Sequence, residues 1–276
     1  KVLRECLMIE VITVNFNDKK GLVDTLKSIQ EQTRKCRLTI VDGGSTDGSL
    51  DIIESNSELI TCYVSEPDTG IYNAMNKGIK LATGDYVIFM NAGDTFVDEN
   101  TLANIVNEVS DNPGFDIYYS DAIYVKATSE HIHHAEHSLI MSKMPFNHQS
   151  TAIKRSLHEE IFYNEGYQIS SDYDFFLRAY KKDAKFHKIE TKIARHSLDG
   201  ISVTSPFHSC LESVHSHLIN YKSIEFDKTE YYGEFFIKEI FKKKPLLARF
   251  TVAIYTMFIK GNKKTMLKSL IRKVLR

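Results

Sequence analysis

One acidic residue follows the most apolar strand-like stretch of the chain. Tyr86–Met90 is an uninterrupted apolar run that leads into the polar tip Asn91–Asp94 (NAGD). Such a run is typical of a central strand covered on both faces, and open α/β sheets bind ligands just beyond the carboxyl ends of such strands. Asp94, beside two small residues that let a ligand approach, is therefore a candidate ligand for a divalent cation. The alternative is that Asp94 caps the next helix or forms an Asx turn.

Further acids stand where a carboxylate could do chemistry. Asp42 ends the apolar stretch Arg37–Asp42 and precedes two glycines, while Asp172 and Asp174 fall in the first turn of a helix expected at Ser170–Lys182. A carboxylate can accept a strong hydrogen bond or act as a general base. Structural roles are also open, because Asp favours turns and because acids in a first helical turn interact well with the helix dipole.

The elements that position these acids alternate along the first part of the chain. Strands are expected at Glu10–Asn15, Arg37–Asp42, Thr61–Ser65, Tyr86–Met90 and Asp116–Ser120. Helices are expected at Leu22–Thr33, from Ser49, from Ile71 and near Thr101–Val109. This alternation predicts an α/β fold with a mostly parallel central sheet and helices on both faces.

The second half of the chain is less regular. Phe146–Lys154 is expected to be a loop entering a strand, and Ala184–His196 a pair of short strands. His131–His137 contains four histidines in seven residues, which invites a metal-binding interpretation. Its spacing suits neither face of a strand nor of a helix, so a solvated polar loop is expected there.

Composition sets outer limits on the protein. With 276 residues, 42% hydrophobic and 26% charged, the chain can bury a full core and form one large domain or a domain with an appendage. The four cysteines fall in no CxxC pair, so reduced thiols in a cytosolic protein are expected. No apolar run reaches the roughly 18–20 residues that span a membrane.

Charge is distributed unevenly. From Lys238 to the end there are twelve Lys or Arg residues and one acid, so the rest of the chain is acidic. Pro245–Ile259 is largely apolar but too short to span a bilayer, and the residues after it place apolar side chains at helical spacing. We expect this basic tail to bind an anionic membrane surface. The alternative is packing on the catalytic body or a partner subunit, and nucleic acid is not expected as a partner because the acidic body would repel phosphate.

Four stretches, taken in order, resemble a known motif series. VITVNFND, IVDGGSTDGS, SEPDTGIYNAMNKGI with ATGDYVIFMNAGD, and SSDYDFFLRAY resemble the motifs of family-2 inverting glycosyltransferases of the GT-A fold, most closely bacterial enzymes that build capsule, exopolysaccharide or O-antigen. The resemblance covers about residues 9 to 205. It implies a GT-A-type catalytic domain at 1–209, with a nucleotide-sugar half at about 1–121 and an acceptor half at about 122–209, followed by a helical basic extension at 210–276.

The resemblance also implies a function. The enzyme would move a sugar from a nucleotide sugar, with UDP favoured and GDP and dTDP open, to a hydroxyl of a saccharide acceptor that is lipid-linked. It would act in surface polysaccharide synthesis in the cytoplasm, bound peripherally to the inner face of the cell membrane. The sugar, the acceptor and the linkage are not specified by the motifs.

Individual residues receive roles from the same resemblance. The nucleotide-sugar-binding residues would be Val14, Asn15, Asn17, Asp42, Asp68, Lys77, Asn91 and Ala92. Asp42 would accept a hydrogen bond from the base and Asp68 would lie near the ribose. Lys77 would reach a phosphate, or else remain a solvated lysine.

The resemblance also implies residues that bind a metal ion. Asp94 matches the family's metal motif, although Asn91 stands where an acid is common. One carboxylate with diphosphate oxygens and waters still suits Mg²⁺ or Mn²⁺. His196 would complete the metal or diphosphate site, or form a structural hydrogen bond.

The acceptor side carries the general base. Asp172 matches the family's base, with Asp174 as its rival. Inversion requires one carboxylate to take the acceptor proton while the nucleoside diphosphate leaves on the opposite face. His148 would line the acceptor side, and Arg178 would pair with either acid or contact phosphate.

Two other functions remain open on the sequence. A sugar-1-phosphate nucleotidyltransferase would share the α/β start and Mg²⁺, but should carry a Gly-rich basic loop after its first strand. Here that loop, Asn15–Lys20, contains no glycine. A non-catalytic nucleotide-sugar-binding module is suggested by the depleted metal motif, and the presence of all four acids at the motif positions counts against it.

Overall fold

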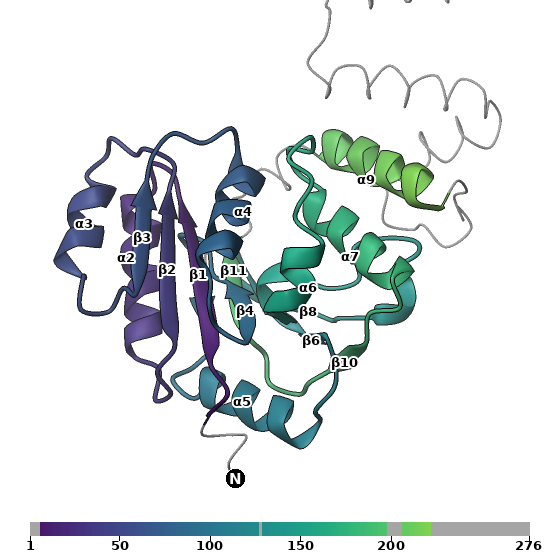
Figure 1. Cartoon of the computed structure of the whole chain (residues 1–276), viewed down its shortest axis with the longest axis horizontal. Coiled ribbons are helices and arrows are strands. Elements are labelled where there is room, and N and C mark those ends of the chain that lie inside the picture. Colours follow the sequence, from purple (N-terminus) through teal and green to yellow (C-terminus); the bar gives the residue numbers. More distant parts are fainter. Residues whose placement is uncertain (1–5, 127–128, 198–205, 222–276) are drawn as a thin grey trace, which may run out of the picture.

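A computed structural model describes residues 6–126, 129–197 and 206–221. At its centre lies a seven-stranded sheet in the order β10-β6-β9-β4-β1-β2-β3 (Figure 1). The strands are β1 Ile9–Asn15, β2 Arg37–Asp42, β3 Cys62–Ser65, β4 Tyr86–Phe89, β6 Ile117–Tyr119, β9 Thr151–Lys154 and β10 Phe186–Lys188. All neighbours pair in parallel except β9, which runs antiparallel to β4 and β6. The expected α/β fold with a mostly parallel sheet is confirmed.

Helices cover both faces of this sheet. They are α2 Lys19–Gln30, α3 Ser49–Ser55, α4 Ile71–Leu81, α5 Thr101–Asp111, α6 Arg155–Glu160, α7 Ser171–Lys181 and α9 Pro206–Tyr221. Alternate residues of β1 divide between the two cores: Ile12 and Val14 pack with α4 and α7, whereas Ile9 and Val11 pack with α2 and α5. A strand buried on both faces presents successive side chains to opposite cores, which explains the uninterrupted apolar runs.

A second, four-stranded sheet lies beside the first, in the order β5-β11-β7-β8. Its strands are β5 Thr95–Phe96, β7 Ala122–Lys126, β8 Ser129–His133 and β11 Ala194–Ser197. The expectation of a loop throughout His131–His137 is wrong for its first three residues, because they pair antiparallel with β7. β8 is an edge strand with little burial, so it lacks the alternating pattern that would have revealed it. Two short 3₁₀ helices follow, η1 His137–Leu139 and η2 His148–Ser150.

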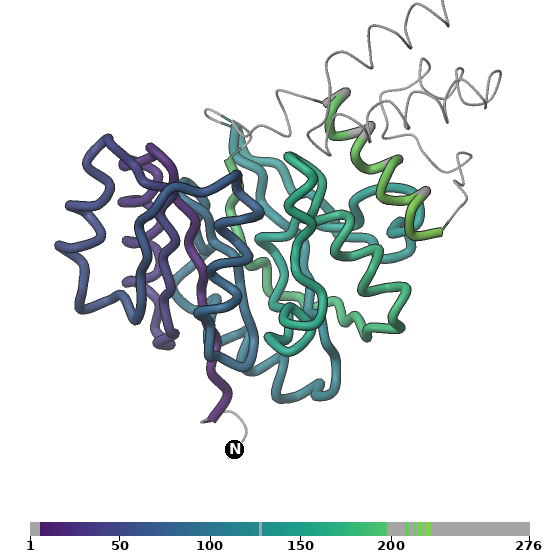
Figure 2. Tube along the Cα trace, turned by 45° about the horizontal axis from the view of Figure 1, so that its top comes forward, coloured from purple at the N-terminus to yellow at the C-terminus, as the bar shows by residue number. Residues whose placement is uncertain are grey.

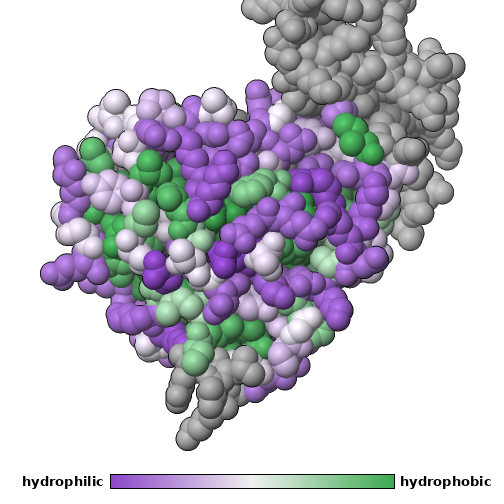
Figure 3. Space-filling view, in the orientation of Figure 1, coloured by the Kyte–Doolittle hydropathy of each residue, from purple (hydrophilic) through white to green (hydrophobic). Residues whose placement is uncertain are grey.

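Helix α9 packs along α7 in both views of the chain (Figures 1 and 2). It begins before residue 209, so the sequence-based division between residues 209 and 210 falls inside this helix. No helix in the described ranges is both long and apolar enough to cross a bilayer. The basic tail from Lys238 lies outside the described residues. Figure 3 shows hydrophilic residues over most of the face in view, with apolar surface in scattered patches.

Candidate active site

The carboxyl ends of three parallel strands meet at one point on the sheet edge. In the strand register Asn15 stands opposite Asp42, and Asp42 opposite Ser65. Asp42 is completely buried and accepts hydrogen bonds from Asn15 Nδ2 at 2.8 Å and Ser65 Oγ at 2.7 Å. The backbone N–H of Ser45 donates to it as well, at 2.9 Å.

These bonds define what Asp42 does. Burial raises its pKa, but the hydrogen bonds from Ser45, Ser65 and Asn15 outweigh burial and hold the pKa below its ordinary value. Asp42 was expected to contact a nucleotide base directly. In this conformation the carboxylate has no exposed surface and instead fixes the loop that follows β2, because its oxygens are taken by the chain's own donors.

The exposed rim of this loop offers the surface for a base. Phe16 follows β1 and is 63% exposed. A Cβ atom on Gly43 would lie 3.0 Å from the Phe16 ring and 2.5 Å from Asp68 Oδ2, so the missing side chain lets Phe16 and Asp68 come together. Asn17 is also exposed and accepts a hydrogen bond from the N–H of Thr46 at 2.8 Å. Phe16 was missed from the sequence, although an aromatic residue inside the polar strand end NFND was a usable signal.

The remaining predicted donor-side residues take supporting positions. Val14 is buried in the core beneath the rim. Asp68 Oδ1 accepts a hydrogen bond from the N–H of Gly70 at 2.8 Å. Lys77 was expected to reach a phosphate or stay solvated. Its Nζ is instead 2.7 Å from Glu66 and 3.2 Å from the carbonyl oxygen of Pro67, so it holds the Glu66–Asp68 loop.

Asp94 lies at the end of β4 in contact with two elements from the second half of the chain. His196 Nδ1 is 2.7 Å from one carboxylate oxygen, and Gln149 Nε2 donates to the other at 3.0 Å. Burial lowers the pKa of His196, but the hydrogen bond and negative charge of Asp94 outweigh burial and raise it. Asp94 does not cap the following helix, because Asp98 Oδ1 accepts the hydrogen bonds there, from Asn100 and Thr101.

Two loops near Asp94 carry buried amide oxygens with unused acceptor capacity. Asn91 Oδ1, Asn147 Oδ1 and Gln149 Oε1 are all buried, and none has a hydrogen-bond partner within the described parts of the chain. Those parts contain no cluster of three or more His, Cys, Asp or Glu residues suited to a metal ion. The Asp94 carboxylate and the unpartnered Asn91 amide oxygen are oxygen groups of the kind bound by a cation that takes few protein ligands and completes its shell with phosphate oxygens and water. Ala92 is partly buried against the core.

Asp172 occupies the first turn of α7, facing this group. Its side chain keeps 20% exposure, and its Oδ2 lies 3.5 Å from His148 Nδ1. The hydroxyl of Tyr72 lies 3.4 Å from its Oδ1. Burial raises the pKa of Asp172 to about 6, in spite of hydrogen bonds from the Tyr173 N–H and the Tyr72 hydroxyl. A carboxylate with a pKa near neutrality is suited to accept a proton.

His148 lies beside Asp172 and directly precedes Gln149, which contacts Asp94. Burial and the nearby charge of His196 lower its pKa to about 3, so the ring is neutral. Its Nε2 is buried and unpartnered among the described residues. The sequence placed His148 on the acceptor side, and the structure places it in contact with Asp172. Gln149 and Tyr72 were missed, because their contacts join segments far apart in the sequence.

The rival acid is committed elsewhere. Asp174 is 3% exposed, and its carboxylate lies 2.7 Å from Arg178 Nε and accepts a hydrogen bond from Ser216 Oγ at 2.6 Å. Arg178 also donates to the carbonyl oxygen of Phe162 at 2.8 Å. Arg178 was expected on the acceptor side, with pairing to one of the two acids as an alternative, and these contacts commit its guanidinium to Asp174 and to Phe162.

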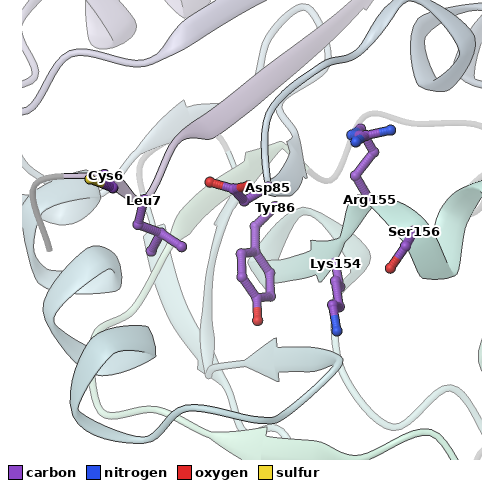
Figure 4. A pocket seen from close by; sticks show the side chains of 7 residues that line it. All are labelled: Cys6, Leu7, Asp85, Tyr86, Lys154, Arg155 and Ser156. Carbon is purple, nitrogen blue, oxygen red and sulfur yellow. The ribbon is translucent and has the colours of Figure 1, made fainter. Parts of the chain in front are cut away.

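A separate pocket opens at the other end of the central strands. It is lined by Cys6, Leu7, Asp85, Tyr86, Lys154, Arg155 and Ser156 (Figure 4). Asp85 and Tyr86 lie at the start of β4, whereas Asp94 follows its end. This pocket therefore takes no part in the arrangement around Asp94 and Asp172.

Comparisons with known proteins agree with this geometry. Residues 10–183 match the family "Glycosyl transferase family 2". A PGL/p-HBAD biosynthesis glycosyltransferase of Mycobacterium bovis is 31% identical over 183 residues, which cover 64% of this chain and 71% of that protein.

Two solved structures show the same fold. One is S. aureus TarS 1-349 in complex with UDP-GlcNAc, with a TM-score of 0.65, 18% identity, and coverage of 91% of this chain and 80% of that one. The other is the Pyrobaculum calidifontis mannosyltransferase PcManGT in complex with GDP-Man and Mn²⁺, with a TM-score of 0.61, 15% identity, and coverage of 97% and 79%. The ordered motifs, the strand-end site and the matched family together show that this chain belongs to glycosyl transferase family 2 and is a glycosyltransferase.

Proposed function

We propose that the protein is an inverting glycosyltransferase in which Asp172 is the general base. The observation that carries this proposal is the contrast on α7 between Asp172, which is partly exposed and has a raised pKa, and Asp174, which is buried and paired. Asp172 accepts the proton of the acceptor hydroxyl as the acceptor oxygen bonds to the anomeric carbon. The bond to the nucleoside diphosphate breaks on the opposite face, and its electron pair leaves with the phosphate.

The leaving group is placed at the Asp94 side of the site. A divalent cation, Mg²⁺ or Mn²⁺, would be held by Asp94, His196 and the Asn91 amide oxygen, and would supply stabilisation of the negative charge on the diphosphate. Support comes from the unpartnered Asn91 oxygen and from the Mn²⁺ in the structure of PcManGT. Gln149 orients the Asp94 carboxylate by its hydrogen bond at 3.0 Å.

The nucleotide base is placed on the rim after β1 and β2. The exposed ring of Phe16 provides an apolar face on which a base can stack, with Asp68 beside it for the ribose. Asn15 keeps Oδ1 buried and without a partner among the described residues, and Asn17 lines the outer edge. UDP is the proposed carrier, supported by UDP-GlcNAc in the TarS structure.

The acceptor is proposed to be a lipid-linked saccharide in bacterial surface polysaccharide synthesis. This proposal rests on the family resemblance and on the basic composition from Lys238 onward, which suits an anionic membrane surface. The enzyme would then act peripherally on the cytoplasmic face of the membrane. Co-sedimentation with anionic liposomes, compared between the full chain and a version ending at Phe236, tests this part separately. Salt should weaken binding of the full chain, and equal sedimentation of both proteins would refute it.

The reaction itself is tested with a panel of UDP-, GDP- and dTDP-sugars in the presence of Mn²⁺. We expect slow hydrolytic release of the nucleoside diphosphate from one carrier, and NMR of the released sugar should show an inverted anomeric centre. Retention of configuration would refute the inverting mechanism. Release of pyrophosphate from a nucleoside triphosphate and a sugar 1-phosphate would identify a nucleotidyltransferase, and binding without turnover would identify a binding module.

A further inference from the structure

The three residues that precede α7 are held by a carboxylate from α9. Glu212 is completely buried, and it accepts hydrogen bonds from three consecutive backbone N–H groups. These belong to Gln168 at 2.7 Å, Ile169 at 2.8 Å and Ser170 at 2.8 Å. Bonds from N–H groups to a carboxylate are charge-assisted and stronger than neutral ones. The segment leading into Asp172 is therefore anchored by a residue some forty positions later in the chain.

Residues 168–170 also contact Tyr72, which lies beside Asp172. The hydroxyl of Tyr72 on α4 donates to the carbonyl oxygen of Ile169 at 2.5 Å and lies 3.4 Å from Asp172 Oδ1. Ser170 Oγ donates to the carbonyl oxygen of Ser209 on α9 at 3.0 Å, and makes no side-chain cap for α7. Residues 168–170 thus lie between α4 and α9, and a shift of this segment would move Asp172.

We propose that Glu212 is a positioning residue for Asp172, so that α9, which lies beyond the family-matched residues 10–183, is a working part of the active site. This inference rests on the proposed role of Asp172 as the base. Glu212 acts in two ways. Its oxygens fix the backbone of residues 168–170, which leads into Asp172. Its negative charge raises the pKa of Asp172.

The charge of Glu212 bears on the proton affinity of Asp172. Burial is the main cause of the raised pKa of Asp172, and the negative charge of Glu212 adds to it. Other titratable groups near Asp172 in the described ranges include Tyr173 and Asp174 on its own helix, His148 on η2, Tyr72 on α4, His196 on β11 and Tyr163. Glu212 itself has His208 of its own helix at 3.3 Å. Removing the Glu212 charge should therefore lower the pKa of the base.

Another contact on α9 provides a matched control. Ser216 lies one turn beyond Glu212 and donates to Asp174, the acid that is committed to Arg178. Ser216→Ala loosens the same pair of helices without touching residues 168–170. A role that is merely structural predicts the same kinetic result for the Ser216 and Glu212 variants at equal loss of thermal stability.

The experiment measures kcat, donor KM and the pH–rate profile for the full chain carrying Glu212→Gln, Glu212→Asp or Ser216→Ala. Glu212→Gln should lower kcat roughly 10- to 100-fold, because a small misplacement of a catalytic group is costly. It should leave donor KM unchanged and move the acid limb of the profile to lower pH. Glu212→Asp keeps the charge but shortens the reach, so kcat should fall while the acid limb stays in place.

Three results would overturn the inference. One is an unchanged kcat and acid limb in Glu212→Gln; another is an equal fall in kcat in Ser216→Ala at matched melting temperature. If Glu212→Gln does not fold, Glu212→Asp decides, and an unchanged kcat there would also overturn it. Full transfer activity in Asp172→Asn is a different outcome, because it would refute the proposed base itself without involving Glu212.

Discussion

Two carboxylates in this protein, the fully buried Asp42 and the partly exposed Asp172, stand in opposite surroundings. Asp42, at the end of β2, is enclosed by hydroxyl, amide and backbone N–H donors, and its pKa is held below the ordinary value. Asp172, at the start of α7, has the Tyr72 hydroxyl and the neutral His148 ring at 3.4 and 3.5 Å, and its pKa rises to about 6. The same side chain thus becomes a fixed anchor in one region and a proton acceptor in the other. Burial raises the pKa of both carboxylates, and the surrounding donors outweigh burial at Asp42 but not at Asp172.

The largest effect on the transfer rate is expected from neutralising Asp172. Asp172→Asn keeps the shape of the side chain but removes the proton acceptor, so transfer should fall by roughly 10²–10⁴. Donor affinity and melting temperature should change little, because the ionised carboxylate gains little from its surroundings. Calorimetric binding of the donor and steady-state transfer rates measure the two quantities. An Asp172→Asn variant that keeps the unchanged protein's transfer rate would show that Asp172 is not the base.

Removing the cation should have the next largest effect. Chelation with EDTA should lower turnover about 10²-fold or more, because the charge of the leaving diphosphate loses its stabilisation. Excess Mn²⁺ should restore turnover in the unchanged protein but not in Asp94→Ala. A chelator-treated enzyme with full activity would refute the role proposed for Asp94 and His196.

A pH titration separates the two carboxylates in a single sample. Asp172 must be ionised to act, so its raised pKa predicts that the transfer rate falls about tenfold per pH unit below pH 6. The pKa of Asp42 is lowered, so the stability that it contributes is present above the unfolded value of 3.8 and is lost only as the pH falls through its folded value. Between about pH 4 and pH 6 the rate should fall while the fold persists. Circular dichroism and transfer assays on the same sample test this, and a joint loss of both would contradict it.

The smallest effect on turnover is expected at Asp42. Asp42→Asn should reduce the free energy of unfolding by about 1–3 kcal/mol, because several buried donors lose a charged acceptor. The donor KM should rise as the rim loop loosens, with kcat changed only a few-fold. Chemical denaturation and initial rates distinguish this pattern from that of Asp172→Asn. A large fall in kcat with unchanged stability would mean that Asp42 contacts the donor after all.

Much of the fold was predictable because it follows local patterns. The apolar runs at β1, β2 and β4 predicted buried parallel strands, and their ends placed Asp42 and Asp94 at one sheet edge. β8 was not predictable, since an exposed edge strand leaves no alternation. The order and spacing of the motifs also singled out Asp172 as the general base through the family resemblance, and that role stays a prediction.

What remained hidden were contacts between distant segments. Asp94 and His196 are 102 positions apart, Asp94 and Gln149 are 55 apart, and no periodicity links them. Asp172 and Asp174 looked equivalent within one helical turn. Only the packing of Arg178 and Ser216 around Asp174 distinguishes them. Lys77 is a long cation whose nearest carboxylate, Glu66, depends on how the loop before α4 folds back, so this ion pair could not be fixed from spacing. Arg178 pairs with Asp174 four residues before it on the same helix, a contact that helical spacing allows.

The reversed direction of β9 has a consequence for how this enzyme could change its substrates. Because β9 runs against β4 and β6, the residues just before it, His148 and Gln149, arrive at the same edge where the parallel strands end. In the proposed mechanism, segments that leave the sheet hold the donor, whereas the segment that enters it brings His148 to Asp172 and Gln149 to Asp94. We therefore expect substitutions at His148 to alter the choice of acceptor while β1, β2 and β4 keep their register. Acceptor preference would then be free to change in evolution through a segment that is not part of the parallel strands.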